Sequence, residues 1–535
     1  MKLSFKHSFC AFLALSISIL FSSCVKNMAA NTFTIANGTG AVTFNPAQIT
    51  SAESERIYAA LYEGLVTINS ETNQPQPGLA AAWHFSSDNR TLTLILRKTS
   101  WTDDTPITAE TVKKSWLYLL QNSTNSKKFL MTELIKGAYA FSVNQCDESA
   151  VGIEIVNDST IKLHFTSPRP DALQCLATSA FAVLPMHVVD AAGQAWADSD
   201  ALVCNGPFKL LSKENNGTVN LTENRKYWNH SNLALARLIF LPAGASSSVY
   251  QDFKDGKIAW IAQVPENSYG LVAGDRNLQK VMQPVVHYCY INNNHGTLND
   301  VKVRKALSLA IDRRILVEDV LDGKAIEATS IVPLQEWQND NEAFNAEKAK
   351  ELLSAAGYPA GKNFPELTLV TNTEDLRHLS VMNYLARCWK ENLGISVNIE
   401  DADWAHFSAK RRRNGYELCR GGWQSFTSDG ASFLEQLIST DAENAGKYNN
   451  PKFDALMRQA ALCTGDQRQD LLKQAENLAI EEECALIPLF YESELQLFNS
   501  DTWEGFNAQN VAATGTLNYM NIRLKNISPD KIMAK

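Results

Sequence analysis

Helical and strand-like patterns alternate along most of this chain, and that alternation restricts it to α/β folds. Residues 91–97 (TLTLILR) place three leucines on one face of a strand. Residues 153–156 and 161–165 show the same two-residue period, and the short polar link Asn157-Asp158-Ser159 joins them. Two such runs with a turn between them predict a hairpin.

Helices are predicted between the strands from their caps and their apolar stripes. Thr108 can cap a helix with Val112, Trp116 and Leu119 inward, and Asn299 or Asp300 can begin another. Further signals are Asn345 as a cap with Gly357 as the stop, a helix over 381–392 that ends at Gly394, and a strand over 395–399. Helix followed by strand, several times, predicts α/β lobes.

The length and charge of the chain narrow the classes further. Its 535 residues exceed what one core usually holds, which predicts two or three lobes. The net charge of −9 comes without a basic stripe, so no nucleic-acid partner is expected. After the first 24 residues the chain has no repeat and no apolar run of 18 residues, which argues against a solenoid or a channel.

The first 24 residues resemble an export signal. Lys2 and Lys6 precede an apolar run over 9–21, which as a helix would span about 20 Å and fall short of a membrane. The run ends Ser22-Ser23-Cys24, which resembles a bacterial lipobox, although Phe21 is bulkier than the usual residue. We expect 1–23 to be a lipoprotein signal peptide and Cys24 to carry the lipid; ordinary cleavage nearby is the alternative.

The sequence contains none of the common motifs for catalysis, metal binding or cofactor binding. The chain has no H-E-x-x-H, no G-x-S-x-G and no strand followed by G-x-G-x-x-G. The run from Gly357 to Lys362 fits a helix end and a turn better than a phosphate loop. None of the eight cysteines from Cys146 onward forms a C-x-x-C pair, so disulfides and buried thiols stay open. We therefore predict no enzyme, no cofactor and no metal.

Short motifs follow one another in a fixed order over nearly all of the chain after Cys24. They are Thr43-Phe44-Asn45-Pro46, Tyr62-Glu63-Gly64-Leu65-Val66, Pro77-Gly78-Leu79-Ala80, Trp101 to Glu110, Asn205-Gly206-Pro207-Phe208, Asn224-Arg225-Lys226-Tyr227-Trp228, Asn299 to Leu307, Trp389 to Ile395, Tyr416 to Leu434 and Ile487-Pro488-Leu489. In this order they resemble the family 5 extracellular solute-binding proteins (peptide/nickel type) of ABC importers, most closely the oligopeptide-binding proteins. Asp104 stands where that family usually has glycine.

The resemblance implies a two-lobed periplasmic-binding-protein fold of the class II, cluster C type, with an extra N-terminal subdomain and a hinged interlobe cleft. The implied boundaries are 24–65, 190–290 and 491–535 for the first lobe, 66–189 for the inserted subdomain and 291–490 for the second lobe. It also implies a monomer, lipid-anchored on the periplasmic side of the inner membrane. That monomer would capture oligopeptides and hand them to an ABC permease with its ATPase subunits.

One binding segment of the oligopeptide binders follows a Gly-Trp pair, which here is Gly422-Trp423. The family often has an aspartate three residues after the tryptophan, which grips the peptide's α-amine, and this chain has Phe426. Three accounts stay open: Asp429 takes over, another acid does so, or the ligand lacks an ordinary free amine. The neighbouring Gln424 and Ser425 are expected to contact the ligand as well.

Other contacts are implied around the ligand. Arg420 stands where some members bind the ligand's C-terminal carboxylate, and a guanidinium suits that task. His378 occupies a similar position if the alignment is anchored at Trp389; otherwise Arg377 does. The first lobe's strand-edge contact is expected at Thr50, Ser51 and Ala52, and Tyr491 is expected to line the cleft or to lie in the core.

Two alternatives to oligopeptide capture remain open. The same fold could bind a modified or cell-wall-derived peptide, a glutathione-like thiol, haem or a nickel chelate. A lipoprotein enzyme, chaperone or surface-interaction protein on this scaffold belongs to a different class, and nothing in the sequence names a reaction for it.

Overall fold

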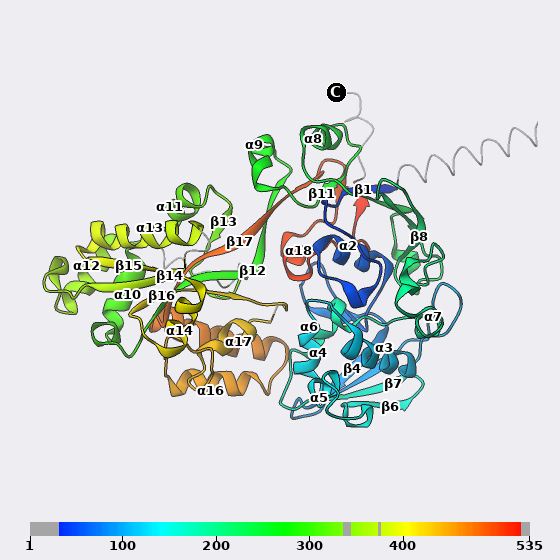
Figure 1. The fold of residues 1–535 in the computed structure, drawn as a ribbon, viewed down its shortest axis with the longest axis horizontal. Coiled ribbons are helices and arrows are strands. Elements are labelled where there is room, and N and C mark those ends of the chain that lie inside the picture. The colour runs from blue at the N-terminus through cyan, green and yellow to red at the C-terminus, as the bar shows by residue number, and fades with distance from the viewer. Residues whose placement is uncertain (1–30, 335–336, 338–343, 373–375, 428, 526–535) are drawn as a thin grey trace, which may run out of the picture.

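Two lobes joined by a pair of long strands make up the protein, as the computed structural model shows (Figure 1). The structure describes residues 31–334, 337, 344–372, 376–427 and 429–525. The proposed signal peptide and Cys24 therefore lie outside the described residues. None of the helices in those ranges is long and apolar enough to cross a membrane.

The connecting strands, β12 (Leu278–Ile291) and β17 (Leu486–Phe498), belong to both lobes at once. They pair antiparallel at the centre of one sheet of order β15-β14-β16-β12-β17-β11-β1-β10-β9-β8. Their register shifts between Met282 and Val286, a stretch that contains Pro284, and proline cannot donate to a ladder. The interruption lies between the lobes, where a hinge must bend.

The first lobe packs helices beside the β11-β1-β10-β9-β8 half of the sheet. Its elements are β1 (Thr32–Ala36), α2 (Ala52–Leu61), β8 (Phe208–Lys213), β9 (Val219–Glu223), β10 (Arg237–Leu241), α8 (Ser247–Lys254), β11 (Trp260–Ile261), α9 (Tyr269–Val272), β18 (Trp503–Glu504), α18 (Ala508–Thr514) and β19 (Arg523–Leu524). α18 lies beside α2 (Figure 1), and Trp503 of β18 packs edge to face on Phe33 of β1, so both ends of the described chain build this lobe.

A separate four-stranded sheet, of order β4-β5-β7-β6, lies between α2 and β8 in the sequence. This region contains β2 (Val66–Ile68), β3 (Pro75–Pro77), β4 (Ala80–Phe85), β5 (Thr91–Leu96), α3 (Ala109–Asn122), α4 (Phe129–Leu134), α5 (Ala138–Ser142), β6 (Ile153–Asn157), β7 (Thr160–His164), α6 (Ala172–Leu176) and α7 (Met186–Ala192). The predicted strand at 91–97 and the hairpin are confirmed. Thr108 caps α3 as expected.

The second lobe buries both faces of its part of the sheet. Its elements are α10 (Val301–Leu309), α11 (Arg313–Ile315), β13 (Ala325–Glu327), α12 (Ala346–Ala355), β14 (Leu367–Asn372), α13 (Leu376–Leu393), β15 (Val397–Ala402), α14 (Trp404–Arg413), β16 (Leu418–Gln424), α15 (Ala431–Leu434), α16 (Pro451–Ala460) and α17 (Gly465–Glu476). Cys289 and Ile291 pack with α10, α12 and α13, whereas Tyr288 and Tyr290 pack with α14, α16 and α17. The alternation is that of a strand covered on both sides.

Most caps predicted for the second lobe are where the sequence placed them. Asn345 caps α12, Gly357 follows it with φ of 95°, and Gly394 follows α13 with φ of 74°. Asp300, not Asn299, caps α10, since its side chain accepts the Lys302 N–H. The strand expected at 395–399 begins later, at Val397, because Ile395 still closes the helix with a bond to Trp389.

Two further sequence features have a structural outcome. Asp104, in the place of a usual glycine, has φ of 74°, the left-handed region that favours glycine. The eight cysteines from Cys146 onward carry free thiols, and six of them are buried. The boundaries expected for the lobes and the inserted subdomain stay a prediction.

Several of the ordered motifs of the first lobe meet at Glu63. Its carboxylate accepts the Tyr227 hydroxyl at 2.5 Å and the Trp228 indole N–H at 2.7 Å. Its backbone exchanges two hydrogen bonds with the Asn205 side chain. Gly206 follows so close to α2 that a Cβ there would lie 2.6 Å from the Leu61 carbonyl carbon. Glu63 thus links segments of the first lobe that are about 140 to 165 residues apart in the sequence.

Burial of Glu63 raises its pKa from 4.5 to about 7, against the lowering effect of its two hydrogen-bond donors. The folded state therefore holds this proton more tightly than the unfolded chain does. The stability that the bound proton contributes is fully present below about pH 4.5 and is lost as the pH rises through about 7.

We expect the free-energy difference between the wild type and Glu63→Gln to fall by about 3 kcal/mol between pH 4.5 and pH 7.5, and to change little above that. Urea denaturation followed by tryptophan fluorescence across this range measures it. Glu71→Gln, at an exposed position in the β2–β3 turn, is the matched control. If the free energies of unfolding of the wild type and of Glu63→Gln changed with pH in the same way, a raised pKa of Glu63 would be contradicted.

Candidate functional site

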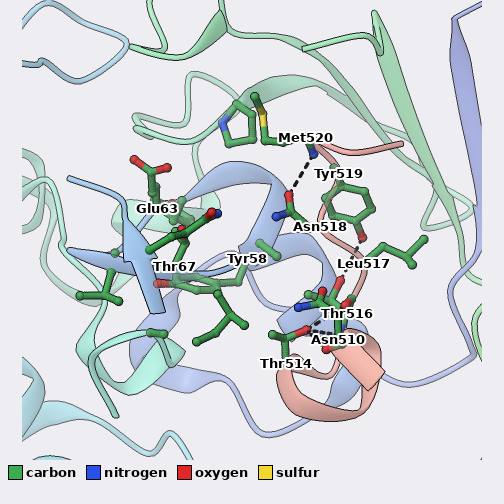
Figure 2. A pocket seen from close by; sticks show the side chains of 18 of the residues that line it. Tyr58, Glu63, Thr67, Asn510, Thr514, Thr516, Leu517, Asn518, Tyr519 and Met520 are labelled. Atoms are coloured by element: carbon green, nitrogen blue, oxygen red, sulfur yellow. Dashed lines mark hydrogen bonds between the residues drawn. The ribbon is translucent and has the colours of Figure 1, made fainter. Parts of the chain in front are cut away.

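A cavity of about 560 Å³ opens in the first lobe and is completed by the second. One wall is α2 with the chain that follows it, including Tyr58, Glu63 and Thr67, and the facing wall is α18 with the chain from Thr516 to Met520 (Figure 2). Phe426 and Thr427, which come from the second lobe, also line it. The volume is in the range of small-ligand sites.

The segment that reaches the cavity is the end of β16 and the loop beyond it. β16 pairs with hinge strand β12, and after its last residue the Ser425 N–H donates to the Pro284 carbonyl at 3.0 Å. The Ser425 hydroxyl donates to the Thr427 carbonyl and accepts the Ser432 hydroxyl, at 2.8 and 2.7 Å. This tight turn, bound to the hinge, presents Phe426 to the first lobe.

Phe426 meets an aromatic partner from the inserted region. Its ring lies 5.1 Å from that of Phe129 on α4, at an interplanar angle of 74°, an edge-to-face arrangement. Two residues before Phe129, the Lys127 ammonium lies 2.8 Å from the Glu55 carboxylate, which also accepts the Ser179 hydroxyl at 2.7 Å. Lys127, Glu55 and Ser179 line the same cavity. With Phe426 and Phe129 they form what we name the Phe426 end.

Asp429, the first candidate to replace the missing acid, is committed elsewhere. Its two carboxylate oxygens accept the Nε and Nη2 hydrogens of Arg468, at 3.1 and 2.8 Å, and one of them also accepts the Ala431 N–H. Only 2% of its side chain is exposed. In this arrangement it serves as a structural anion inside the second lobe.

The two arginine–carboxylate pairs of this region face each other across the lobes. Arg169 on the inserted region holds Asp171 in a bidentate pair at 2.9 and 2.7 Å, and its backbone N–H donates to the Asn89 carbonyl. The Asn89 amide in turn donates to the Ala461 carbonyl of the second lobe at 3.3 Å. The Arg468 charge also attracts Asp171. The lobes thus touch along this edge.

Arg420 and His378 come from neighbouring parts of the second lobe. The Arg420 Nε–H donates to the Asn372 side chain at 2.8 Å, and its guanidinium lies 5.1 Å from the Phe407 ring. Asn372 ends β14, six residues before His378 in the first turn of α13. The His378 ring lies 5.8 Å from that of His287 on β12, while the alternative, Arg377, is 3.3 Å from Glu492.

The remaining predicted residues divide between surface and core. Ser51 caps α2 with an extended backbone (φ −129°, ψ 153°), and Thr50 and Ala52 beside it are exposed. Tyr491 is fully buried, and its hydroxyl donates to the Ser330 and Val332 carbonyls, so it lies in the core and not in the cleft lining.

The other members of the predicted binding segment follow β16. Gln424 is exposed, Trp423 is partly buried against the core, and a Cβ on Gly422 would touch the His287 ring. No sequence pattern pointed to Phe129, Lys127, Glu55 or Arg468, because their roles depend on contacts between distant segments. Among the described residues, no group of three or more His, Cys, Asp or Glu side chains is placed to hold a metal ion.

Removal of Arg468 would leave Asp429 as a buried, unpaired charge. We expect Arg468→Met to lower the free energy of unfolding by about 3–5 kcal/mol, and Asp429→Asn added to it to restore part of the loss. Lys114→Met, which removes an exposed pair with Glu110, should cost less than about 1 kcal/mol. Denaturation followed by circular dichroism measures the free energy of unfolding of Arg468→Met, of the double variant and of Lys114→Met. A loss in Arg468→Met as small as that in Lys114→Met would contradict a structural role for Asp429.

The comparisons with known proteins cover most of the chain. A family model described as bacterial extracellular solute-binding proteins, family 5 Middle, matches residues 74–445. The periplasmic oligopeptide-binding protein OppA of Salmonella typhimurium is 27% identical over 471 residues, which cover 85% of this chain and 86% of OppA. The periplasmic murein peptide-binding protein MppA of Escherichia coli is 29% identical over 461 residues, which cover 83% of this chain and 85% of MppA.

The three-dimensional match supports the same relationship. The unliganded open form of MppA, a periplasmic murein tripeptide binding protein, superposes with a TM-score of 0.82 at 25% identity and covers 92% of this chain and 97% of that one. On the family match over residues 74–445, this chain belongs to the bacterial extracellular solute-binding proteins of family 5.

Proposed function

We propose that this protein captures oligopeptides between its two lobes and delivers them to an ABC permease with its ATPase subunits, without making or breaking a bond. The relatives support the cargo, since OppA is named for oligopeptides and MppA for murein peptides. The fold supports the mechanism, since two strands with an interrupted ladder join the lobes. A ligand that contacts both lobes stabilises the closed arrangement through its greater affinity for it.

One observation carries the proposal: the cavity draws its lining from both lobes. α2, α18 and their neighbouring chain make most of it, and Phe426 with Thr427 complete it from the far side of the hinge. A site built in this way is fully formed only when the lobes meet. Closure also excludes water, which strengthens each hydrogen bond to the ligand.

The backbone and charge of the flanking segments suit an extended peptide. Ser51 offers an extended backbone on the first lobe, and β16 ends beside the hinge on the second, so that a peptide can pair as an added strand. Such pairing gives affinity without reading side chains. Arg420 beside Asn372, close to the first turn of α13, is where we place the ligand's C-terminal carboxylate, since a guanidinium fork and a helix N-terminus both favour an anion.

We expect Arg420→Ala to weaken peptide binding by about 10- to 100-fold through the loss of a charge-assisted contact. Peptides that co-purify are first identified by native mass spectrometry and acid release, and the affinity for one of them is then measured by calorimetry. Arg412→Ala, at an exposed arginine on α14, is the control. Scattering should show a smaller radius of gyration with peptide; a protein that binds peptide with no change in shape would contradict hinge closure.

The proposed route to the membrane is lipidation of Cys24 after removal of 1–23, on the periplasmic side of the inner membrane, with the protein acting as a monomer. We expect Cys24→Ser to move the protein from the membrane fraction to the soluble fraction while peptide affinity stays the same, because none of the residues that line the cavity precedes Glu55. Cell fractionation and the mass of the mature N-terminal peptide measure this. Retention of Cys24→Ser in the membrane fraction would contradict a lipid anchor.

A further inference from the structure

The acidic side chains that line the cavity are already engaged. At the Phe426 end, Glu55 pairs with Lys127 at 2.8 Å and accepts the Ser179 hydroxyl at 2.7 Å. Further along, Glu63 accepts two hydrogen bonds, and burial raises its pKa to about 7, so that it carries less charge than an ordinary glutamate at neutral pH. Lys127 therefore balances the charge of Glu55, and the described lining at the Phe426 end carries no net negative charge.

The acid nearest in the sequence cannot turn toward the cavity without a large cost. Asp429 is held by both arms of Arg468 and by the Ala431 N–H, with 2% of its side chain exposed. A move of Asp429 to the ligand would leave Arg468 buried without its anion, and breaking a buried pair costs about 3–5 kcal/mol. One new ion pair with a ligand would not recover this.

What the Phe426 end offers instead is aromatic surface. The Phe426 and Phe129 rings meet edge to face at 5.1 Å, one from each lobe, and 36% of Phe129 is still exposed. An ammonium placed against them loses water and gains only a cation–π contact of about 0.5–2 kcal/mol. An apolar group placed there gains about 25 cal/mol for each Å² removed from water.

The same end also has a donor for a neutral acceptor. The Lys127 ammonium has three hydrogens, and its contact with Glu55 uses one direction. The carbonyl of an amide can accept a hydrogen bond from such a donor, whereas an ammonium has no acceptor for it. Aromatic surface beside a hydrogen-bond donor suits an acyl group, which combines an apolar part with a carbonyl acceptor.

We propose that the Phe426 end receives an uncharged acyl group, so that this protein prefers peptides whose α-amine is acylated to the same peptides with a free amine. This rests on the proposed function and on a ligand that runs from Arg420 toward Phe426. Phe426 is then a specificity-determining residue, with Phe129 as its partner on the opposite lobe.

The test is a competition within one peptide pool. A random tripeptide pool is divided, one half is N-acetylated, the halves are recombined, and bound species are counted by native mass spectrometry. We expect the wild type to retain acetylated forms at least tenfold over free forms. Phe426→Asp should reverse the ratio by supplying a carboxylate, and Phe426→Leu, which keeps the site apolar, should preserve it. Thermal melting confirms that both variants fold.

Each other outcome contradicts a stated part of the argument. An equal ratio in the wild type, or an excess of free-amine peptides, overturns this inference and leaves the proposed function standing. Binding of neither half overturns the proposed function, and this inference with it. An unchanged ratio in Phe426→Asp shows that the group at the N-terminus is read elsewhere, and removes Phe426 from its role.

Discussion

The antiparallel pairing of β12 with β17 is the interaction on which the rest of the structure depends. These two strands run through the one sheet that both lobes share, and each contributes residues to the core of either lobe. Their ladder is interrupted around Pro284, which cannot donate a hydrogen bond, and its register shifts again between His287 and Tyr288. The Pro284 carbonyl accepts the Ser425 N–H, so the binding loop is attached to the hinge itself. Bending at the hinge and movement of Phe426 relative to the first lobe are therefore one motion.

Buried, hydrogen-bonded acidic side chains keep the parts on either side of that hinge rigid. Glu63 binds distant segments of the first lobe together, and Arg468 with Asp429 does the same for the loop that carries Phe426. Hydrogen bonds of this kind leave little freedom for side chains to rearrange, because an unpaired buried charge is costly. The cleft can therefore change its width while the shape of each wall stays constant, which is what a binder that closes around its ligand requires.

Local features could be predicted from the sequence because they depend on neighbours in the chain. The Thr108 and Asn345 caps, the 153–165 hairpin and the stop at Gly357 each follow from a few adjacent residues. The left-handed conformation of Asp104 agrees with the glycine usually found in its place. Asp429 and Tyr491 could not be placed in this way, since their partners Arg468 and Ser330 are 39 and 161 residues away. The lining of the cavity was inaccessible for the same reason, as it is assembled from segments of both lobes.

A frame of this kind allows ligand chemistry to change at a single position. Phe426 lies in a turn whose geometry is set by Ser425, Thr427 and Ser432, and none of those bonds involves its side chain. A phenyl ring or a carboxylate can stand there with the same backbone hydrogen bonds, and the difference is felt by the ligand, by Phe129 across the cleft and by the first-lobe core on which the Phe426 ring packs. A carboxylate facing Phe129 would lose water without a partner until a ligand amine arrived, whereas the ring is satisfied before the ligand binds. The substitution thus alters which form of the ligand's N-terminus is favoured and leaves the hydrogen bonds of the hinge and of the turn as they are.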